Sequence, residues 1–138
     1  FSDKEFDLVL AIRKSVFVEE QGVNADLEFD GKDPEANHYL LYLDTKPIAT
    51  ARWRITLNGI KLERFAVLPD YRNKKIGAEL LNRIMNDALT MNLPIYLHAQ
   101  QGAANFYSRN GFSTVGNIFF EAGIAHVKME FKKEPSKS

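Results

Sequence analysis

The fold is decided by VLPDYRNKKIGA, residues 67–78, which joins a strand-like segment to a helix-like one. The apolar run 62–68 favours extended structure, and Pro69 interrupts its ladder of hydrogen bonds. From there the apolar side chains recur at spacings of three and four, which predicts a helix over 76–92. Such a junction directs free backbone N–H groups and the positive end of the helix dipole beyond the strand. With Arg72 and the lysines that follow it, the junction predicts an anion site, above all for phosphate groups.

The composition is that of a globular chain rather than a disordered one. Of its 138 residues, 45% are hydrophobic and ten are phenylalanine, enough for a single domain with a substantial core. Eighteen basic and eighteen acidic residues cancel, which argues against a general binder of nucleic acid or membrane surfaces. There is no cysteine, no apolar run long enough for a bilayer and no secretory signal, so we expect a cytoplasmic protein without disulfides.

Apolar periodicity and turn signals predict the order helix, three strands, helix, strand, helix, two strands. A capping box, Ser2 with Glu5, opens a first helix that ends near Gly22, and a polar loop follows over 24–37. This order favours a mixed sheet with helices on both faces, in one domain over 1–131 with a polar tail over 132–138. The predicted strands are 38–43, 48–56, a third ending at 68, 95–99, 114–120 and 125–131, and the later helices are 76–92 and 102–110.

Motifs at several places in the chain match those of one known family. The matching residues are the loop Arg72–Gly77, Gln100 with Phe106-Tyr107 and Gly111-Phe112, the segment Arg13–Val23, and the pieces Ala51-Arg52 and Gly123–Val127. In this order and spacing they resemble the GCN5-related N-acetyltransferase (GNAT) superfamily, and within it a small bacterial subgroup. Two positions depart from the family pattern: Lys75 replaces the first glycine of the loop motif, and Gln100 replaces an asparagine. The family's usual first strand would lie before Ser2.

The resemblance implies a GNAT-like acyl-CoA N-acyltransferase fold: α/β, with a mixed, mostly antiparallel twisted sheet and helices on both faces. It implies acetyl-coenzyme A (acetyl-CoA) as donor, with the pyrophosphate on the loop amides and the pantetheine arm along the preceding strand. Because Lys75 has a Cβ, we expect ordinary helical backbone geometry there, with its ammonium able to reach a phosphate. The alternative is a solvated basic helix start that binds nothing. The residues implied for coenzyme binding are Phe65, Ala66, Val67, Arg72, Asn73, Lys74, Lys75, Ile76, Gly77, Ala78, Gln100, Asn105, Phe106 and Tyr107.

Tyr107 matches the residue that serves as the acid in the family. A phenol with a pKa of about 10, placed beside the sulfur, could give its proton to the leaving thiolate. The alternative for Tyr107 is an amphipathic surface aromatic. Gln100 could hydrogen-bond the pantetheine amides, and its alternative is a cap at the end of a strand.

The base that deprotonates the acceptor amine has several candidates. Glu63 lies on the coenzyme strand, and strand alternation predicts that it shares a face with Phe65 and Val67. Its alternative is a structural ion pair with Arg52 or Arg64. Further candidates are Glu20, His38 and His126, although scattered histidines are more often structural, and their spacing does not suggest a metal site.

We expect the acceptor pocket to be lined by Arg13, Glu20, Arg52 and His126, with Glu19 nearby. A buried Arg–Glu pair that holds helix to sheet would explain the arginines equally well.

The sequence therefore predicts an N-acetyltransferase that moves an acetyl group from acetyl-CoA to a primary amine of a small molecule or peptide. With no cysteine and no serine elbow motif, we expect direct transfer in a ternary complex, without a metal. The alternative is a non-catalytic acyl-CoA sensor, and a nucleotide-binding module is disfavoured because the Gly-x-x-x-x-Gly-Lys-Ser/Thr pattern is missing. We expect no nucleic-acid or membrane partner, and a homodimer could form through the C-terminal hairpin.

Overall fold

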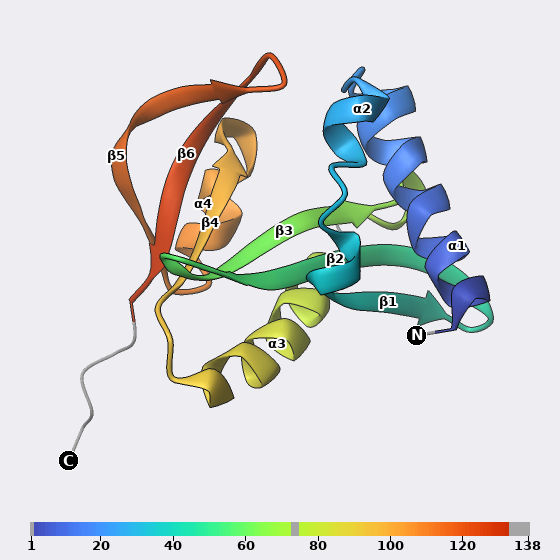
Figure 1. Cartoon of the computed structure of the whole chain (residues 1–138), viewed down its shortest axis with the longest axis horizontal. Helices are drawn as coiled ribbons and strands as arrows, with labels where there is room; N and C mark the ends of the chain where they lie inside the picture. Colours follow the sequence, from blue (N-terminus) through green and yellow to red (C-terminus); the bar gives the residue numbers. More distant parts are fainter. Residues whose placement is uncertain (1, 73–74, 133–138) are drawn as a thin grey trace.

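The computed structural model describes residues 2–72 and 75–132. Within these residues a sheet of β-strands is flanked by α-helices and joined by short 3₁₀ and π-helical turns (Figure 1). The strands are β1 (Asn37–Leu43), β2 (Lys46–Thr56), β3 (Gly59–Val67), β4 (Ile95–Gln100), β5 (Phe112–Glu121) and β6 (Ile124–Phe131). The helices are α1 (Asp3–Arg13), α2 (Ala25–Glu28), α3 (Ile76–Ala88) and α4 (Ala104–Ser108).

The sheet has the strand order β1-β2-β3-β4-β6-β5. Its neighbouring strands run antiparallel except for β3 and β4, which are parallel because α3 crosses between them. The predicted mixed, mostly antiparallel sheet is therefore confirmed.

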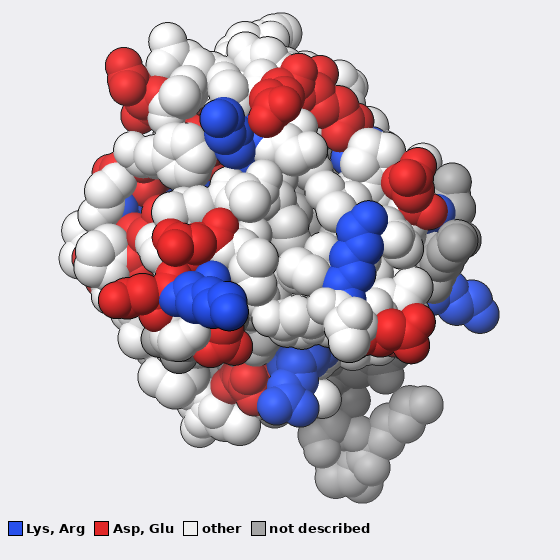
Figure 2. All heavy atoms as spheres, turned by 90° about the vertical axis from the view of Figure 1, so that its right-hand side faces the viewer, with Lys and Arg blue, Asp and Glu red and all other residues white. Residues whose placement is uncertain are grey.

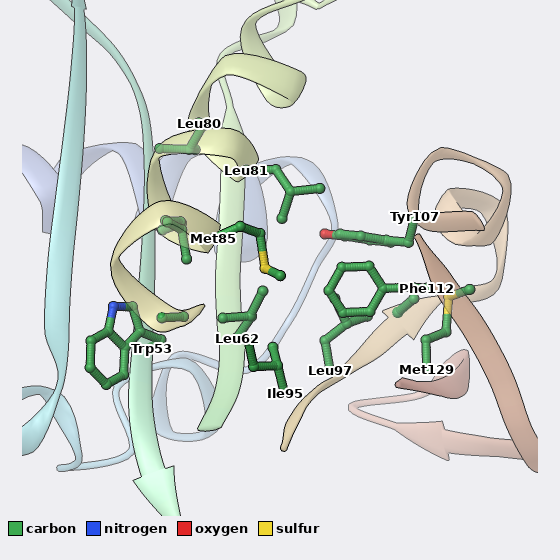
Figure 3. Close-up of a cluster of buried hydrophobic side chains, with 14 of the residues drawn as sticks. Trp53, Leu62, Leu80, Leu81, Met85, Ile95, Leu97, Tyr107, Phe112 and Met129 are labelled. Atoms are coloured by element: carbon green, nitrogen blue, oxygen red, sulfur yellow. The ribbon is translucent and has the colours of Figure 1, made fainter. Parts of the chain in front are cut away.

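Helices cover both faces of the sheet, as predicted (Figure 1). On one face α1 packs Ile12 against Ala66 of β3, and Val16 of the following π-helical turn joins them. On the other face the apolar stripe of α3, including Leu81 and Met85, packs against Leu62 of β3 in the larger core (Figure 3). The helical period found in the sequence thus corresponds to burial.

β3 and β4 pair only near their N-terminal ends. Their ladder joins 60–62 of β3 to 95–97 of β4, and no further pair forms although both strands continue. The two strands diverge beyond Leu62 and Leu97, and the second half of β3 keeps a strand partner only on the β2 side. This divergence opens the sheet at the carboxyl ends of its two parallel strands, the place where open α/β sheets bind ligands.

A β-bulge in β3 overturns one prediction about which side chains share a face. Thr50 pairs with Ala66 and Arg52 pairs with Glu63, so β3 carries one residue more than β2 over this interval. Arg64 lies in the bulge with a φ of +59°. As a result Glu63 is on the face of Ala66 toward α1, and not on the face of Phe65 as strict alternation predicts.

The element boundaries differ from prediction mainly at helix ends. The first helix changes to a π-helical turn, η1 (Lys14–Glu20), and the predicted loop after it contains α2 and the 3₁₀ turn η2 (Asp33–Glu35). The helix predicted to reach residue 92 ends at Ala88 and is followed by a 3₁₀ turn. The helix predicted over 102–110 is split into a 3₁₀ turn and the short α4.

The predicted polar tail over 132–138 lies outside the described residues apart from Lys132. Within the described part of the chain, every helix is too short or too polar to cross a membrane.

Candidate active site

A cavity of about 420 Å³ lies where β3 and β4 diverge. Residues of η1 and α2 line it on one side, and residues around the β5–β6 turn line it on another. Five residues predicted for the site from sequence meet in this cavity: Glu63, Phe65, Gln100, Tyr107 and His126. The structure thus brings together side chains from β3, β4, α4 and β6 that are far apart in the sequence.

Lys75 adopts a backbone conformation that the sequence analysis did not predict. Its φ of +62° and ψ of 15° place it in the left-handed region, and it forms the N-cap of α3. The expectation of ordinary helical geometry at Lys75 is therefore wrong, because the chain turns at this residue before the helix begins. Left-handed backbone is what glycine adopts without strain, so the conformation of Lys75 is one that a glycine at this motif position could share.

The N–H groups of residues 76–78, in the first turn of α3, come before the first intrahelical bond, which Glu79 donates to Lys75, and they point back along the helix axis beyond its N-terminal end. Ile76 is buried, whereas Gly77 and Ala78 are only partly covered. A Cβ at Gly77 would make ordinary contact with the ring of Phe106, 3.5 Å away, and φ at Gly77 is not positive. The fold itself therefore tolerates a side chain at Gly77, and a ligand that approaches the backbone closely would supply a reason for glycine.

Arg72 is held by the protein on both sides of its guanidinium. Its Nε donates to the carbonyl oxygen of Val67 at 2.9 Å, and its terminal nitrogens donate to the two carboxylate oxygens of Glu20 at 2.6 and 2.7 Å. Glu20 therefore lies at the loop rather than in the cavity. Both side chains are more than a third exposed, so a phosphate could compete with Glu20 at little cost. Asn73 and Lys74 lie outside the described residues.

Tyr107 is buried in the wall of the cavity. Its ring contacts Phe65 edge-on at a centroid distance of 6.0 Å and Phe106 at 5.0 Å, and its hydroxyl extends toward Leu81 of α3 (Figure 3). Burial raises the pKa of Tyr107, so the phenol stays protonated at neutral pH. It is then a weaker acid than a thiol, and a hydrogen bond to sulfur is easier for it than complete proton transfer.

Gln100 reaches across the cavity at the end of β4. Its Nε2 donates to Oε1 of Gln21, just after η1, at 2.8 Å. The Gln100 side chain thus joins β4 to the helical layer across the cavity, and both glutamines line the cavity.

The remaining residues predicted for coenzyme binding surround this site without lining the cavity. Ala66 is buried against α1, and Val67 and Phe106 are partly buried and pack against the larger core. Asn105 is exposed on α4.

Val67 belongs to the part of β3 that has no partner on the β4 side. Leu68 donates to Ile48 of β2. Because backbone groups alternate along a strand, those of Val67 face the open edge and those of Ala66 face β2. The carbonyl oxygen of Val67 accepts from Arg72 there, and its N–H is open to an extended ligand.

Glu63 is surrounded by cations. Arg52 and Arg54 donate to its Oε1 at 3.1 and 2.7 Å, and Lys61 lies 3.2 Å from Oε2. Burial would raise the pKa of Glu63, but the hydrogen bond from Arg54 and the charges of Arg52 and Lys61 outweigh it and lower the pKa to about 2. A carboxylate so stabilised is a weak base, which favours the structural alternative for Glu63 over the catalytic one.

Arg13 and Arg52 form the buried pair of cations that holds the helical layer to the sheet. Arg13 donates to Glu28 and Asp33, both at 2.6 Å, and Arg52 donates to Asp33 at 2.7 Å and to Asp30 at 2.8 Å. Both arginines are at most 1% exposed, and neither lines the cavity. This arrangement matches the structural alternative for these residues rather than contact with an acceptor.

The candidate histidines occupy different environments. His38 lies on β1, with Nε2 3.0 Å from the backbone oxygen of Asp33, and is not part of the cavity. His126 lines the cavity, and its Nδ1 is 2.7 Å from the carbonyl oxygen of Ile124. Because a carbonyl only accepts, Nδ1 carries the hydrogen.

The cavity is also lined by residues that were not among the candidates from sequence, and two of them are in contact. His98 of β4 and Glu121 at the end of β5 line the cavity, and Nδ1 of His98 is 2.6 Å from Oε1 of Glu121. Strand alternation with Gln100 was the available signal for His98, but the contact with Glu121 crosses β6 and has no sequence signature. Among the described residues, no group of three acidic, histidine or cysteine side chains is placed to hold a metal ion.

Acidic and basic side chains alternate over the face that carries the helical layer, and neither sign gathers over a broad area (Figure 2).

Comparison with known proteins identifies the class to which this fold and site belong. The model of the acetyltransferase (GNAT) domain matches residues 7–133, and the chain belongs to this family. It is 33% identical to YjcF of Bacillus subtilis (strain 168), described as an uncharacterized N-acetyltransferase, over 86% of each chain.

Two solved structures have the same fold. The structure of ElaA from Escherichia coli is 28% identical, with a TM-score of 0.87 over 95% of this chain and 92% of that chain. An acyl-CoA N-acyltransferase from Pseudomonas aeruginosa is 27% identical, with a TM-score of 0.86 over 96% and 93%. The predicted family and fold are therefore both confirmed.

Proposed function

We propose that this protein transfers an acetyl group from acetyl-CoA to the primary amine of a small molecule or peptide, directly and in a ternary complex. The observation that carries the proposal is the divergence of β3 and β4 into a cavity that contains Tyr107 and Gln100. The open edge of β3 leads to the left-handed turn at Lys75 and the free amides of α3. Family membership and the likeness to an acyl-CoA N-acyltransferase support the choice of donor.

In this proposal each part of the site has one task. The amides of the first turn of α3 hold the pyrophosphate, helped by the helix dipole and by Lys75. The open edge of β3 at Phe65 and Val67 binds the pantetheine arm as an additional strand would, and Gln100 leaves Gln21 to bind a pantetheine amide. Tyr107 donates a hydrogen bond to the sulfur.

The acceptor nitrogen attacks the thioester carbon, the new C–N bond forms, and the C–S bond breaks. Negative charge then develops on sulfur, and a donor already in place stabilises it without reorganisation. The coenzyme thiolate takes up a proton, and the amine loses one to a base in the cavity.

The proposal is tested by calorimetric titration with acetyl-CoA and by thiol release over a panel of primary amines. Because the chain has no cysteine, a thiol reagent reports coenzyme release without background from the protein. Binding together with turnover on at least one amine supports an enzyme. Tight binding without turnover on any amine would support the sensor instead, and absence of binding would reject both.

The phosphate end of the proposal has a separate test. Lys75→Glu is expected to weaken acetyl-CoA binding about tenfold at low salt and less at high salt, because salt screens charge. The matched control is Lys4→Glu, the same charge change at an exposed position of α1. Equal affinity of the two variants would show that the Lys75 side chain points away from the phosphates.

A further inference from the structure

His98 lies at the point where β4 separates from β3. Leu97 is the last residue of β4 that pairs with β3, and His98 follows it directly. In the proposed binding mode the pantetheine arm runs from the Arg72–Gly77 loop between the open edges of β3 and β4. Its thioester end is then directed toward the place where the two strands separate. His98 and Glu121 both line the cavity here.

The contact between His98 and Glu121 determines which ring nitrogen is available. Nδ1 lies 2.6 Å from the carboxylate oxygen Oε1, so Nδ1 carries a hydrogen and donates it. In the neutral ring Nε2 then holds the lone pair. The one hydrogen bond of the His98 side chain to the described residues is made through Nδ1, which leaves Nε2 open.

Glu121 is well placed to orient the ring. It ends β5, and its hydrogen bond crosses β6 to reach β4. That hydrogen bond lowers the pKa of Glu121, so the carboxylate is ionised at neutral pH. Its negative charge stabilises the positive charge that forms on the imidazole. The ring is also held by Phe119, at a centroid distance of 5.0 Å.

We propose that His98, oriented by Glu121, is the base that takes the proton from the acceptor amine. This inference rests on the proposed acetyl transfer. As the nitrogen attacks the thioester carbon and the C–S bond breaks, one N–H proton passes to Nε2 of His98 and from there to solvent. The coenzyme thiolate takes up a proton from solvent or through Tyr107, which regains its own, so charge and protons balance.

Other ionisable groups surround this pair. Lys61 and Glu63 approach from β3, and their charges partly cancel through the 3.2 Å contact between them. His126 and Lys128 approach from β6, facing Gln100 and His98 in the ladder. His126 is the competing base, because its Nδ1 is also tied to an acceptor and its Nε2 is also left open.

The decisive variant is His98→Asn. The amide nitrogen of asparagine can replace Nδ1 and still donate to Glu121, while Nε2 is lost. We expect kcat/KM to fall at least about a hundredfold at pH 7, as is usual for removal of a general base. We also expect the acidic limb of the pH profile to disappear, added imidazole to restore part of the rate, and acetyl-CoA affinity to stay within about twofold.

Glu121→Gln tests the positioning role separately. Glutamine can still accept from Nδ1, so we expect a smaller loss, with the acidic limb moved to lower pH because the imidazolium has lost its carboxylate partner. A merely structural hydrogen bond would leave the limb where it is.

Three outcomes separate the possibilities. Normal turnover and an unchanged pH profile in His98→Asn would overturn the assignment. So would loss of the acidic limb in His126→Asn with His98→Asn unaffected, and that result would move the base to His126. Absence of turnover in the wild-type protein on every amine would instead reject the acetyl transfer on which the base depends.

Discussion

Lys75 has the left-handed backbone of a glycine together with the side chain of a cation. Left-handed geometry costs an L-residue roughly 1–2 kcal/mol, and the surrounding turn holds Lys75 in it. The resemblance implies pyrophosphate binding at this turn, and the departure from the family motif adds a cation there in a backbone conformation that suits glycine.

Lys75→Gly is expected to raise the free energy of unfolding by about 0.5–1 kcal/mol, because glycine removes the strain but makes the unfolded chain more flexible. Urea unfolding measures the change. Ala78→Gly, in the first turn of α3, should instead destabilise the protein by a similar amount. A destabilised Lys75→Gly variant would show that the ammonium makes a stabilising contact.

Tyr107→Phe is expected to lower kcat at least about tenfold with acetyl-CoA affinity little changed, because only the hydrogen bond to the developing thiolate is lost. Thiol release gives kcat, and calorimetry gives the affinity. Tyr42→Phe, at an exposed tyrosine of β1, is the matched control. Unaltered turnover would remove Tyr107 from the chemistry.

At the scale of elements, the site depends on where the parallel pairing of β3 and β4 begins and ends. It begins next to Gly59, where Ile60 donates to the carbonyl of Pro94 at 2.8 Å. Gly59 has a φ of +121°, and a Cβ there would lie 2.3 Å from that same carbonyl oxygen. The bulge at Arg64 lies beyond the last pair and turns Glu63 toward the arginine cluster.

Gly59→Ala is expected to lower the free energy of unfolding by more than about 2 kcal/mol, since left-handed strain is joined by a clash with backbone. The comparison is Gly31→Ala, where φ is +77° and no atom lies within 4 Å of the added Cβ. The Gly31→Ala variant should lose only roughly 1–2 kcal/mol of unfolding free energy, the cost of left-handed backbone geometry for an L-residue. Equal losses of stability in the two variants would mean that the start of β3 and Pro94 move apart at little cost and so relieve the clash.

At the scale of the whole molecule, a buried charge cluster joins the helical layer to the sheet. Arg13 and Arg52 meet Glu28, Asp33 and Glu63 with little exposure to solvent. Removing one partner from such a cluster leaves an uncompensated buried charge, which is far more costly than losing a surface pair. The cluster therefore links stability to pH.

Glu63→Gln is expected to cost about 3 kcal/mol or more at pH 7. The pKa of Glu63 is lowered to about 2 in the folded protein from its ordinary value of 4.5. Its stabilising contribution is therefore complete above about pH 4.5 and is lost as pH falls toward 2. Urea unfolding from pH 7 to pH 3 should show the difference between wild type and variant narrowing on the acid side.

The control for Glu63→Gln is Glu35→Gln, whose carboxylate is 63% exposed and 3.9 Å from Arg54. We expect a change within about 0.5 kcal/mol at every pH. A constant difference between wild type and Glu63→Gln down to pH 3 would contradict the ion-pair account.

The sequence by itself determined the order of elements, the mixed sheet and the family, because apolar periodicity, turn residues and motif spacing are local properties of the chain. Motif spacing also predicted Tyr107 and Gln100 as site residues, and both line the cavity. Tertiary structure alone decided the face of Glu63, the left-handed Lys75 and the pairing of His98 with Glu121. These depend on one extra residue in a strand, on strain held by neighbours, and on a contact across a third strand. None of these has a signature in sequence spacing, because each arises only when separate segments pack together.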